Sequence, residues 1–205
     1  MNYVELSIEK LKEENKKLYD IIRKEYDFDC VVFIARGSYL IGEEIASFNN
    51  VKLLEIFATR KSASLIKKIA SPMLKILPKS LKKFLRKSEL KSGIHNKDSE
   101  RVISYNKSKF NGDYKKILLV DDSIDTGNTI CQVYDQLRKI FPNSEIKTAV
   151  LNIFTAAKTK FTPDFSLYED TVILGPWSND SKEYTKYIHE YKKWHDNYEG
   201  DTNEK

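Results

Sequence analysis

The sequence predicts an α/β domain with a mostly parallel central sheet, flanking helices and a basic helical insertion. The main evidence is that two segments of the chain each read strand, loop, helix, strand. That order is a βαβ unit, and its two strands must run parallel. With 205 residues, the chain can bury about two-thirds or more of its unfolded surface in one core. We therefore expect a single domain that carries an insertion.

The first half of the chain predicts a helix and then the first βαβ unit. Val4–Tyr26 places Leu and Ile among charged residues at near-helical spacing, which is typical of an amphipathic helix that covers a sheet. Cys30–Ala35 is a continuous apolar run, as in a strand buried on both faces. It breaks at Arg36-Gly37-Ser38 into a helix that ends near Phe48, and Val51–Ala58 reads as the next strand.

The second half predicts another βαβ unit, a last strand and a last helix. The expected elements are a strand at Ile117–Val120, a helix at Thr129–Phe141, a strand at Glu145–Phe154, a strand at Thr171–Leu174 and a helix at Ser181–Asn197. The predicted domain covers residues 1–198, with the basic insertion at 62–93 and a disordered tail at 199–205.

The segment Asp121–Thr129 carries the chemistry. A loop that leaves a parallel strand and opens a helix presents unpaired N–H groups and the positive end of the helix dipole, which favour a phosphate. Thr126 and Thr129 add hydroxyl donors, and Gly127 permits close backbone approach. The carboxylates of Asp121 and Asp122 would repel a phosphate, so they need hydroxyl donors or a cation. A ribose diol with Mg²⁺ meets that need.

This segment resembles the phosphoribosyl-pyrophosphate motif of type I phosphoribosyltransferases: four apolar residues, two acids, two variable positions, then Asp-Thr-Gly-x-Thr. The resemblance implies that fold and a Mg²⁺-dependent pentosyltransferase, a glycosyltransferase that uses phosphoribosyl pyrophosphate. It implies that Asp121 and Asp122 hold the ribose hydroxyls beside Mg²⁺, as direct or indirect ligands. It also implies that Asp125 handles the acceptor's proton and that the phosphate is held by Asp125, Thr126, Gly127, Asn128 and Thr129. The alternative is an ordinary acidic turn with Asp125 as the helix N-cap.

Two further segments resemble the family's pyrophosphate site. Arg36, Gly37 and Ser38, at the end of the first strand, look like the loop that meets pyrophosphate. Lys61 follows the second strand, where family members often offer a basic side chain. The alternatives are a plain turn with a solvated Arg36 and a solvated Lys61 that opens the insertion.

The acceptor is indicated by the stretch Pro163–Trp177, which is similar to the small hood of the xanthine-guanine and related purine phosphoribosyltransferases, where an Asp-Thr-x-Ile run, here Asp170–Ile173, precedes Pro-Trp. The resemblance places Val172 and Trp177 near an acceptor base and Lys158 near its exocyclic oxygen, which implies a 6-oxopurine. The alternative for Trp177 is a core or hood aromatic whose indole N–H is satisfied at the surface.

The insertion is strongly basic. From Arg60 to Lys91 there are 11 basic residues and one acid, Glu89, a net of +10, so the rest of the chain carries 5 − 10 = −5. Residues 81–87 alternate apolar and cationic positions as in an amphipathic helix. Such a helix can fold onto the protein's own hood, bind an anionic membrane surface, or bind nucleic acid, in that order of preference. The last option gives an alternative function, a phosphoribosyl-pyrophosphate-sensing regulator that binds nucleic acid.

The sequence also bears on where the protein is located and how it assembles. The N-terminal residues lack a secretory signal, and no apolar stretch approaches the roughly 20 residues that cross a bilayer. Cys30 and Cys131 form no CxxC pair. We expect a cytoplasmic protein, peripheral at the membrane if the insertion binds there, that takes a small-molecule acceptor and forms a homodimer.

Overall fold

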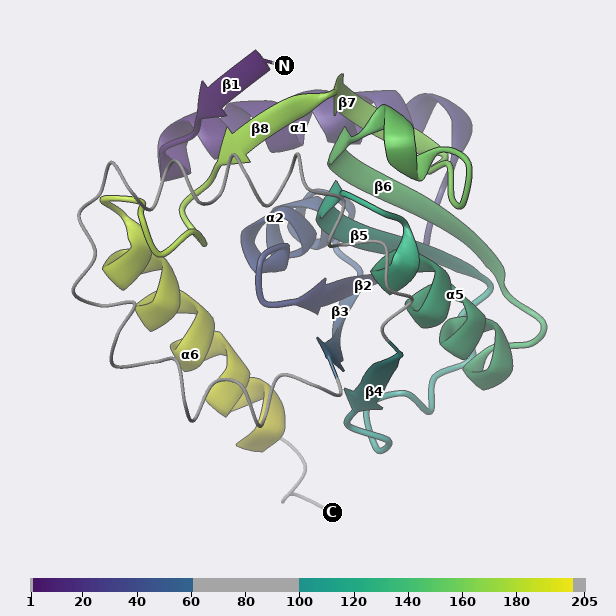
Figure 1. Ribbon diagram of the computed structural model, residues 1–205. Coiled ribbons are helices and arrows are strands. Elements are labelled where there is room, and N and C mark those ends of the chain that lie inside the picture. The colour runs from purple at the N-terminus through teal and green to yellow at the C-terminus, as the bar shows by residue number, and fades with distance from the viewer. Residues whose placement is uncertain (1, 61–99, 201–205) are drawn as a thin grey trace. The chain divides into compact units, whose positions relative to one another are not determined.

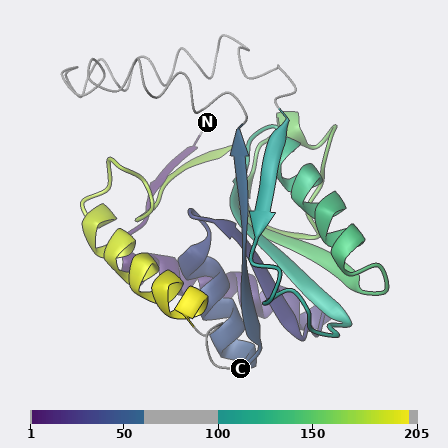
Figure 2. The ribbon, with the colours of Figure 1, turned by 90° about the horizontal axis from the view of Figure 1, so that it is seen from below.

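A six-stranded sheet, ordered β4-β3-β2-β5-β6-β7, forms the centre of the computed structural model, which describes residues 2–60 and 100–200 (Figure 1). The pairs β2–β3, β2–β5, β5–β6 and β6–β7 are all parallel, as predicted. The arrows of β3 and β4 point in opposite directions (Figure 2). A separate two-stranded parallel sheet joins β1 to β8. The strands are β1 (Asn2–Glu5), β2 (Cys30–Ala35), β3 (Lys52–Arg60), β4 (Arg101–Tyr105), β5 (Lys116–Ile124), β6 (Glu145–Ile153), β7 (Phe165–Glu169) and β8 (Thr171–Leu174).

Helices cover both faces of the central sheet, with α1, α2 and α6 on one face and α5 on the other (Figures 1 and 2). The continuous apolar run of β2 follows from this arrangement. Val31 and Phe33 pack under α1 and α2, whereas Val32 and Ile34 pack under α5, so successive side chains enter two separate cores. The helices are α1 (Ile8–Glu25), α2 (Tyr39–Asn49), α5 (Asn128–Ile140) and α6 (Tyr184–Gly200), with a 3₁₀ turn at Thr155–Ala157.

The start of the chain differs from the prediction. The first helix begins at Ile8 rather than at Val4, because the Ser7 hydroxyl accepts a hydrogen bond from the Lys10 N–H at 3.2 Å and so caps the helix. The preceding residues form β1 and pair with β8, where the Leu6 N–H donates to the Leu174 carbonyl at 3.0 Å. The predicted hood is therefore divided: β8 pairs with β1, and β7 joins the central sheet.

One strand ends later than predicted, and two strands were not predicted. β5 does not end at Val120 but continues to Ile124, because Asp121, Ser123 and Ile124 remain in register with β6. The loop before α5 is correspondingly short. β4 and β7 were not predicted, because they are short strands whose burial is only partial.

Part of the chain lies outside the described residues. The chain divides into a main unit, Met1–Ala58 with Ile103–Lys205, and a second unit, Thr59–Val102. The predicted insertion 62–93 and Lys61 fall outside the described residues, as do residues 201–205. α6 continues to Gly200, two residues into the predicted tail. Among the described helices, none combines the length and apolarity that a bilayer crossing requires.

Candidate active site

The paired carboxylates lie at the C-terminal end of β5. Asp121 is only 7% exposed, and its Oδ1 accepts a hydrogen bond from the Asp122 N–H at 3.0 Å. Burial raises the pKa of Asp121, and the neighbouring Asp122 charge raises it further. Burial also raises the pKa of Asp122, to about 6. Backbone hydrogen bonds lower both pKa values but do not offset the effect of burial, so a hydroxyl donor or a cation beside the two carboxyl groups would stabilise their ionised forms.

The predicted pyrophosphate loop meets these carboxylates. β2 and β5 are neighbouring parallel strands, paired through Phe33 and Val120, so the loops that follow them emerge at the same edge of the sheet. A Cβ atom added to Gly37 would lie 3.0 Å from Cγ of Asp122. The loop after β2 thus approaches the end of β5 so closely that a side chain at this position would press on the Asp122 carboxylate. Ser38 is fully buried, and its hydroxyl donates to the Ile34 carbonyl at 2.6 Å, back toward β2.

A tyrosine from α6 holds the same loop from the other side. The Tyr187 hydroxyl donates to the Arg36 carbonyl and lies 3.3 Å from the Gly37 carbonyl oxygen. Tyr187 is fully buried and packs edge-to-face against Tyr39 at the start of α2. The sequence analysis did not identify this residue. The only available signal was its place on the apolar face of the last helix.

The predicted phosphate loop is compact and opens α5. Gly127 is the N-cap, with a left-handed φ of 77°, and no side chain caps the helix. The alternative in which Asp125 caps this helix is therefore wrong. Asn128 is buried and Thr129 partly exposed in the first turn, and Thr126 is also partly exposed. The first turn of α5 carries no acidic side chain, so its N–H groups suit an anion.

The segment after β6 covers this loop. The Lys160 ammonium donates to Oδ1 of Asn128, and a Cβ atom on Gly127 would lie 3.3 Å from Cβ of Lys160. A cationic side chain is thereby placed against the predicted phosphate loop. Sequence reasoning selected Lys158 in this segment and did not select Lys160.

A chain of hydrogen bonds leads from the hood to Asp125. The Thr171 N–H in β8 donates to Oδ1 of Asn152 at 3.1 Å, and Nδ2 of Asn152 donates to the Ser123 hydroxyl at 3.3 Å. That hydroxyl in turn donates to Oδ1 of Asp125 at 3.1 Å. Asn152 is fully buried, whereas Asp125 is exposed. The chain orients a solvent-accessible carboxylate through a buried amide, and neither Ser123 nor Asn152 was predicted to matter.

The three predicted acceptor residues, Lys158, Val172 and Trp177, each have different neighbours. The Lys158 ammonium forms an ion pair with Glu169 at 2.7 Å. Val172 lies in β8 opposite Tyr3 of β1 and is partly buried. Trp177 packs on the backbone of Gly175, where an added Cβ would lie 2.3 Å from its ring. The Trp177 ring also meets the Tyr187 ring edge-to-face, with ring centroids 6.5 Å apart. This packing is what we expect if Trp177 is a core or hood aromatic.

Comparison with known proteins is consistent with this site. The family model for the phosphoribosyl transferase domain matches residues 6–182, a range that ends just before α6. No curated protein matches the sequence.

Solved structures with the same fold include purine enzymes. A purine phosphoribosyltransferase from Pyrococcus horikoshii is 19% identical, with a TM-score of 0.60, over 88% of this chain and 97% of that one. The xanthine-guanine-hypoxanthine phosphoribosyltransferase of Helicobacter pylori is 16% identical, with a TM-score of 0.62, over 90% and 99%. A hypothetical protein from Neisseria gonorrhoeae with bound ppGpp is 15% identical, with a TM-score of 0.60, over 92% and 94%.

The chain belongs to the phosphoribosyl transferase domain family, a family of pentosyltransferases. The predicted family is confirmed, as is the predicted fold with its parallel central sheet and flanking helices. The roles assigned to individual site residues stay predictions.

Proposed function

We propose that the protein transfers a phosphoribosyl group from phosphoribosyl pyrophosphate to a 6-oxopurine, with Mg²⁺ and with release of pyrophosphate. The observation that carries this proposal is the close approach of Gly37, in the loop after β2, to the Asp122 carboxylate at the end of β5. The family uses these two segments for two parts of one substrate. A ligand that spans a diol and a pyrophosphate fits that junction better than either group alone.

The residues on the two loops fit the proposed substrate and metal. Carboxylate oxygens are the ligands that Mg²⁺ prefers, and Asp121 and Asp122 supply them beside a position for ribose hydroxyls. Bound there, Mg²⁺ would neutralise charge on the pyrophosphate leaving group. The 5-phosphate would take the uncapped first turn of α5 together with Thr126 and Thr129. The backbone of Arg36 to Ser38 and Lys61 would meet the pyrophosphate.

Asp125 would take the proton that the acceptor base loses. It is exposed, so a bound base can reach it, and Ser123 and Asn152 orient it. A general base must lie within hydrogen-bond reach of its proton in a fixed geometry, and the buried Asn152 provides the fixed point. Positioning, rather than covalent catalysis, would supply most of the rate enhancement.

The choice of a 6-oxopurine rests on the hood. The stretch Asp170–Trp177, the two purine enzymes that share the fold, and a lysine-bearing segment over the phosphate loop all favour it. Lys158 would have to exchange its Glu169 partner for the exocyclic oxygen, with Val172 and Trp177 as the apolar wall.

Pyrophosphate release against a panel of bases tests the proposal. We expect turnover with a 6-oxopurine to exceed turnover with orotate or adenine, and to vanish without Mg²⁺. Equal or greater turnover with orotate would contradict the acceptor assignment. Binding of phosphoribosyl pyrophosphate without turnover of any base would instead support the regulator, which should then bind nucleic acid in a salt-dependent manner.

Calorimetric measurement of phosphoribosyl pyrophosphate binding tests the role of the two carboxylates. Asp121→Asn with Asp122→Asn should abolish binding of phosphoribosyl pyrophosphate, whereas Asp135→Asn, an exposed control on α5, should leave it unchanged. A folded double variant with unchanged affinity would refute the assignment of these residues to the ribose.

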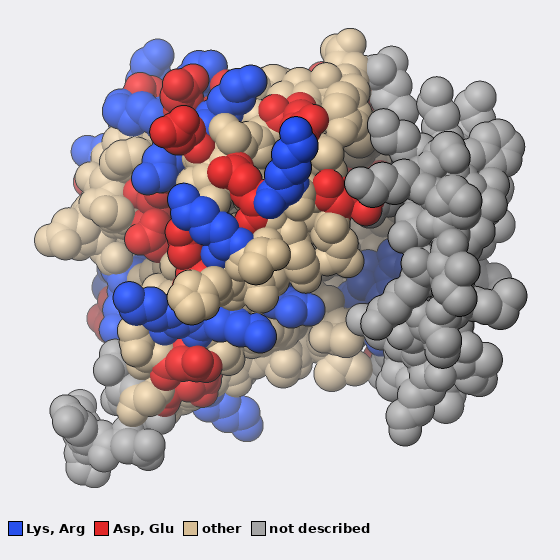
Figure 3. Space-filling model, turned by 90° about the vertical axis from the view of Figure 1, so that its left-hand side faces the viewer, with Lys and Arg blue, Asp and Glu red and all other residues tan. Residues whose placement is uncertain are grey.

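For the insertion we propose attachment to anionic membranes from the cytoplasmic side. Lys and Arg side chains are interspersed with Asp and Glu on the face drawn in Figure 3, and the chain outside Arg60–Lys91 carries a net charge of −5. The charge excess of +10 within that segment is therefore the feature that would bring the protein to an anionic surface. Each engaged cation contributes on the order of 1 kcal/mol there.

A further inference from the structure

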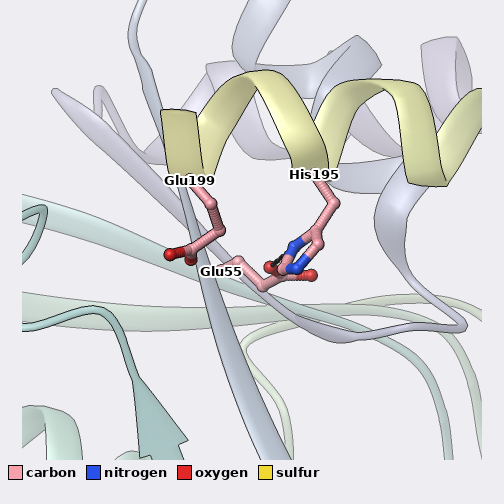
Figure 4. Close-up of side chains that lie close together, drawn as sticks. All are labelled: Glu55, His195 and Glu199. Atoms are coloured by element: carbon pink, nitrogen blue, oxygen red, sulfur yellow. Dashed lines mark hydrogen bonds and ion pairs between the residues drawn. The ribbon is translucent and has the colours of Figure 1, made fainter. Parts of the chain in front are cut away.

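Three potential metal ligands converge away from the two loops of the active site. They are Glu55 in the middle of β3 and His195 and Glu199 in the last two turns of α6 (Figure 4). One ligand atom from each lies within 4.8 Å of the other two. His195 and Glu199 are four residues apart, so they extend from the same side of the helix toward the strand. We call these three residues the Glu55 cluster.

Glu55 is an unusual residue for its position. Its side chain is 1% exposed and lies on a strand whose other central residues are apolar. On the same face of β3, Phe57 meets the His195 ring at a centroid distance of 6.0 Å. Removing the Glu55 carboxylate from water has a desolvation cost, and a cation beside the group would compensate that cost.

Outer hydrogen bonds already orient both carboxylates of the cluster. The Tyr191 hydroxyl donates to Oε1 of Glu55 at 2.5 Å, while Oε2 faces Nδ1 of His195 at 2.6 Å. Nδ2 of Asn106 donates to Oε2 of Glu199 at 2.8 Å. Each carboxylate is thus held through one oxygen by a neutral donor. Metal sites use such second partners to fix ligand orientation.

The ligand types select a class of metal. Mg²⁺ and Ca²⁺ take oxygen ligands, whereas an imidazole nitrogen with two carboxylates suits a divalent transition metal such as Zn²⁺. Three protein ligands leave one tetrahedral position for water. Zinc bonds of about 2.0–2.2 Å require ligand atoms about 3.4 Å apart, so the 2.6 Å contact between His195 and Glu55 would open slightly. Glu199 lies within reach, because its ligand atom is within 4.8 Å of the other two.

We propose that Glu55, His195 and Glu199 bind one Zn²⁺ ion, which joins the C-terminal end of α6 to β3. This site is separate from the Mg²⁺ that the proposed reaction uses, because its residues come from the middle of a strand and from the last helix. It does not depend on the proposed function. Tyr187 on the same helix donates a hydrogen bond to the loop after β2. An ion that holds α6 against β3 would therefore also help to hold Tyr187 in place.

The experiment is a Zn²⁺ titration of the full-length protein after dialysis against a chelator, followed by calorimetry and by thermal unfolding. We expect one ion per chain and a rise in the unfolding temperature, because the ion binds only the folded state. Glu199→Gln changes an exposed side chain and His195→Gln a partly exposed one, so both variants should fold. Each should weaken Zn²⁺ binding by at least about 100-fold, more than the loss of an outer partner causes.

Matched controls lie on the same helix. His189→Gln and Asp196→Asn change one imidazole and one carboxylate at exposed positions, and they should leave the Zn²⁺ affinity unchanged. Tyr191→Phe should weaken binding by about 10- to 100-fold, as an outer-partner loss does.

Two results would overturn the proposal. The first is wild-type protein that takes up no Zn²⁺, in which case Glu55, Tyr191 and His195 form only a hydrogen-bonded anchor for α6. The second is unchanged binding in both ligand variants, which would place the ion elsewhere in the chain.

Discussion

Asp122 should lower the stability of the unliganded protein at neutral pH. Burial raises its pKa from the ordinary 3.8 to about 6, a difference of about 2 units. At about 1.4 kcal/mol per unit, the ionised form costs about 3 kcal/mol of folding free energy. That figure is an upper bound, because Asp122 is only partly buried and solvent screens its charge.

The direction of the pH dependence follows from proton binding. A carboxyl group with a higher pKa in the folded chain holds more protons there than in the unfolded chain. The free energy of unfolding therefore falls as the pH rises between the two pKa values. For Asp122 the loss begins near pH 4 and is nearly complete somewhat above pH 6. We expect Asp122→Asn to be more stable than wild type by about 1–3 kcal/mol at neutral pH and to approach wild type below about pH 4.

Urea unfolding followed by tryptophan fluorescence measures this difference at a series of pH values. Trp177 and Trp194 both lie against the core and should report the transition. Asp135→Asn on α5 serves as the control, because it removes an exposed carboxylate at a distance from the pair. A stability difference between Asp122→Asn and wild type that is the same at every pH would refute the argument. With phosphoribosyl pyrophosphate and Mg²⁺ present the order should reverse, since only wild type can bind them tightly.

Three further predictions concern other parts of the chain. Tyr187→Phe removes a donor from the Arg36 carbonyl, so we expect a loss of about 0.5–1.5 kcal/mol in urea unfolding and a several-fold higher KM for phosphoribosyl pyrophosphate with little change in kcat; an unchanged KM would count against the role of this contact. Asn152→Ala should lower the free energy of unfolding by about 1–3 kcal/mol, and it should lower kcat in the pyrophosphate assay because it breaks the hydrogen bonds that lead to Asp125. A kcat equal to that of wild type would show that these hydrogen bonds have no catalytic effect. Deletion of 62–93 should abolish co-sedimentation with anionic vesicles, and wild type should pellet less as salt rises; wild type that stays in the supernatant at low salt would exclude membrane binding.

The sequence was sufficient to predict those elements whose structure is determined by periodicity and local motifs. The buried strand Cys30–Ala35 and the turn that opens α5 could be placed, because a continuous apolar run predicts a buried strand and the Gly-containing segment before the apolar periodicity predicts a turn. The extension of β5 through Ile124 could not be placed. Its polar residues look like a loop, and only the register with β6 keeps them in the sheet.

The missed site residues share a different cause. Tyr187 and Asn152 act through contacts with residues far away in the sequence, which no local pattern reveals. Glu55 did leave a signal, since a carboxylate interrupts an otherwise apolar strand. That signal becomes informative only when α6 is known to place Tyr191 and His195 against it.

The order of the strands also bears on why this chain can carry so long an insertion. The connection from the end of β3 to the start of β4 contains the predicted insertion, and these two strands are neighbours in the sheet. The folded sheet thus holds the two ends of the connection together, so the cost that a flexible connection adds at this point is the entropy of closing a loop. That entropy grows only logarithmically, by about 0.6 kcal/mol for each doubling of length. Segments of very different length and composition can therefore be exchanged at this point, while the strands that build the two ligand loops keep their register.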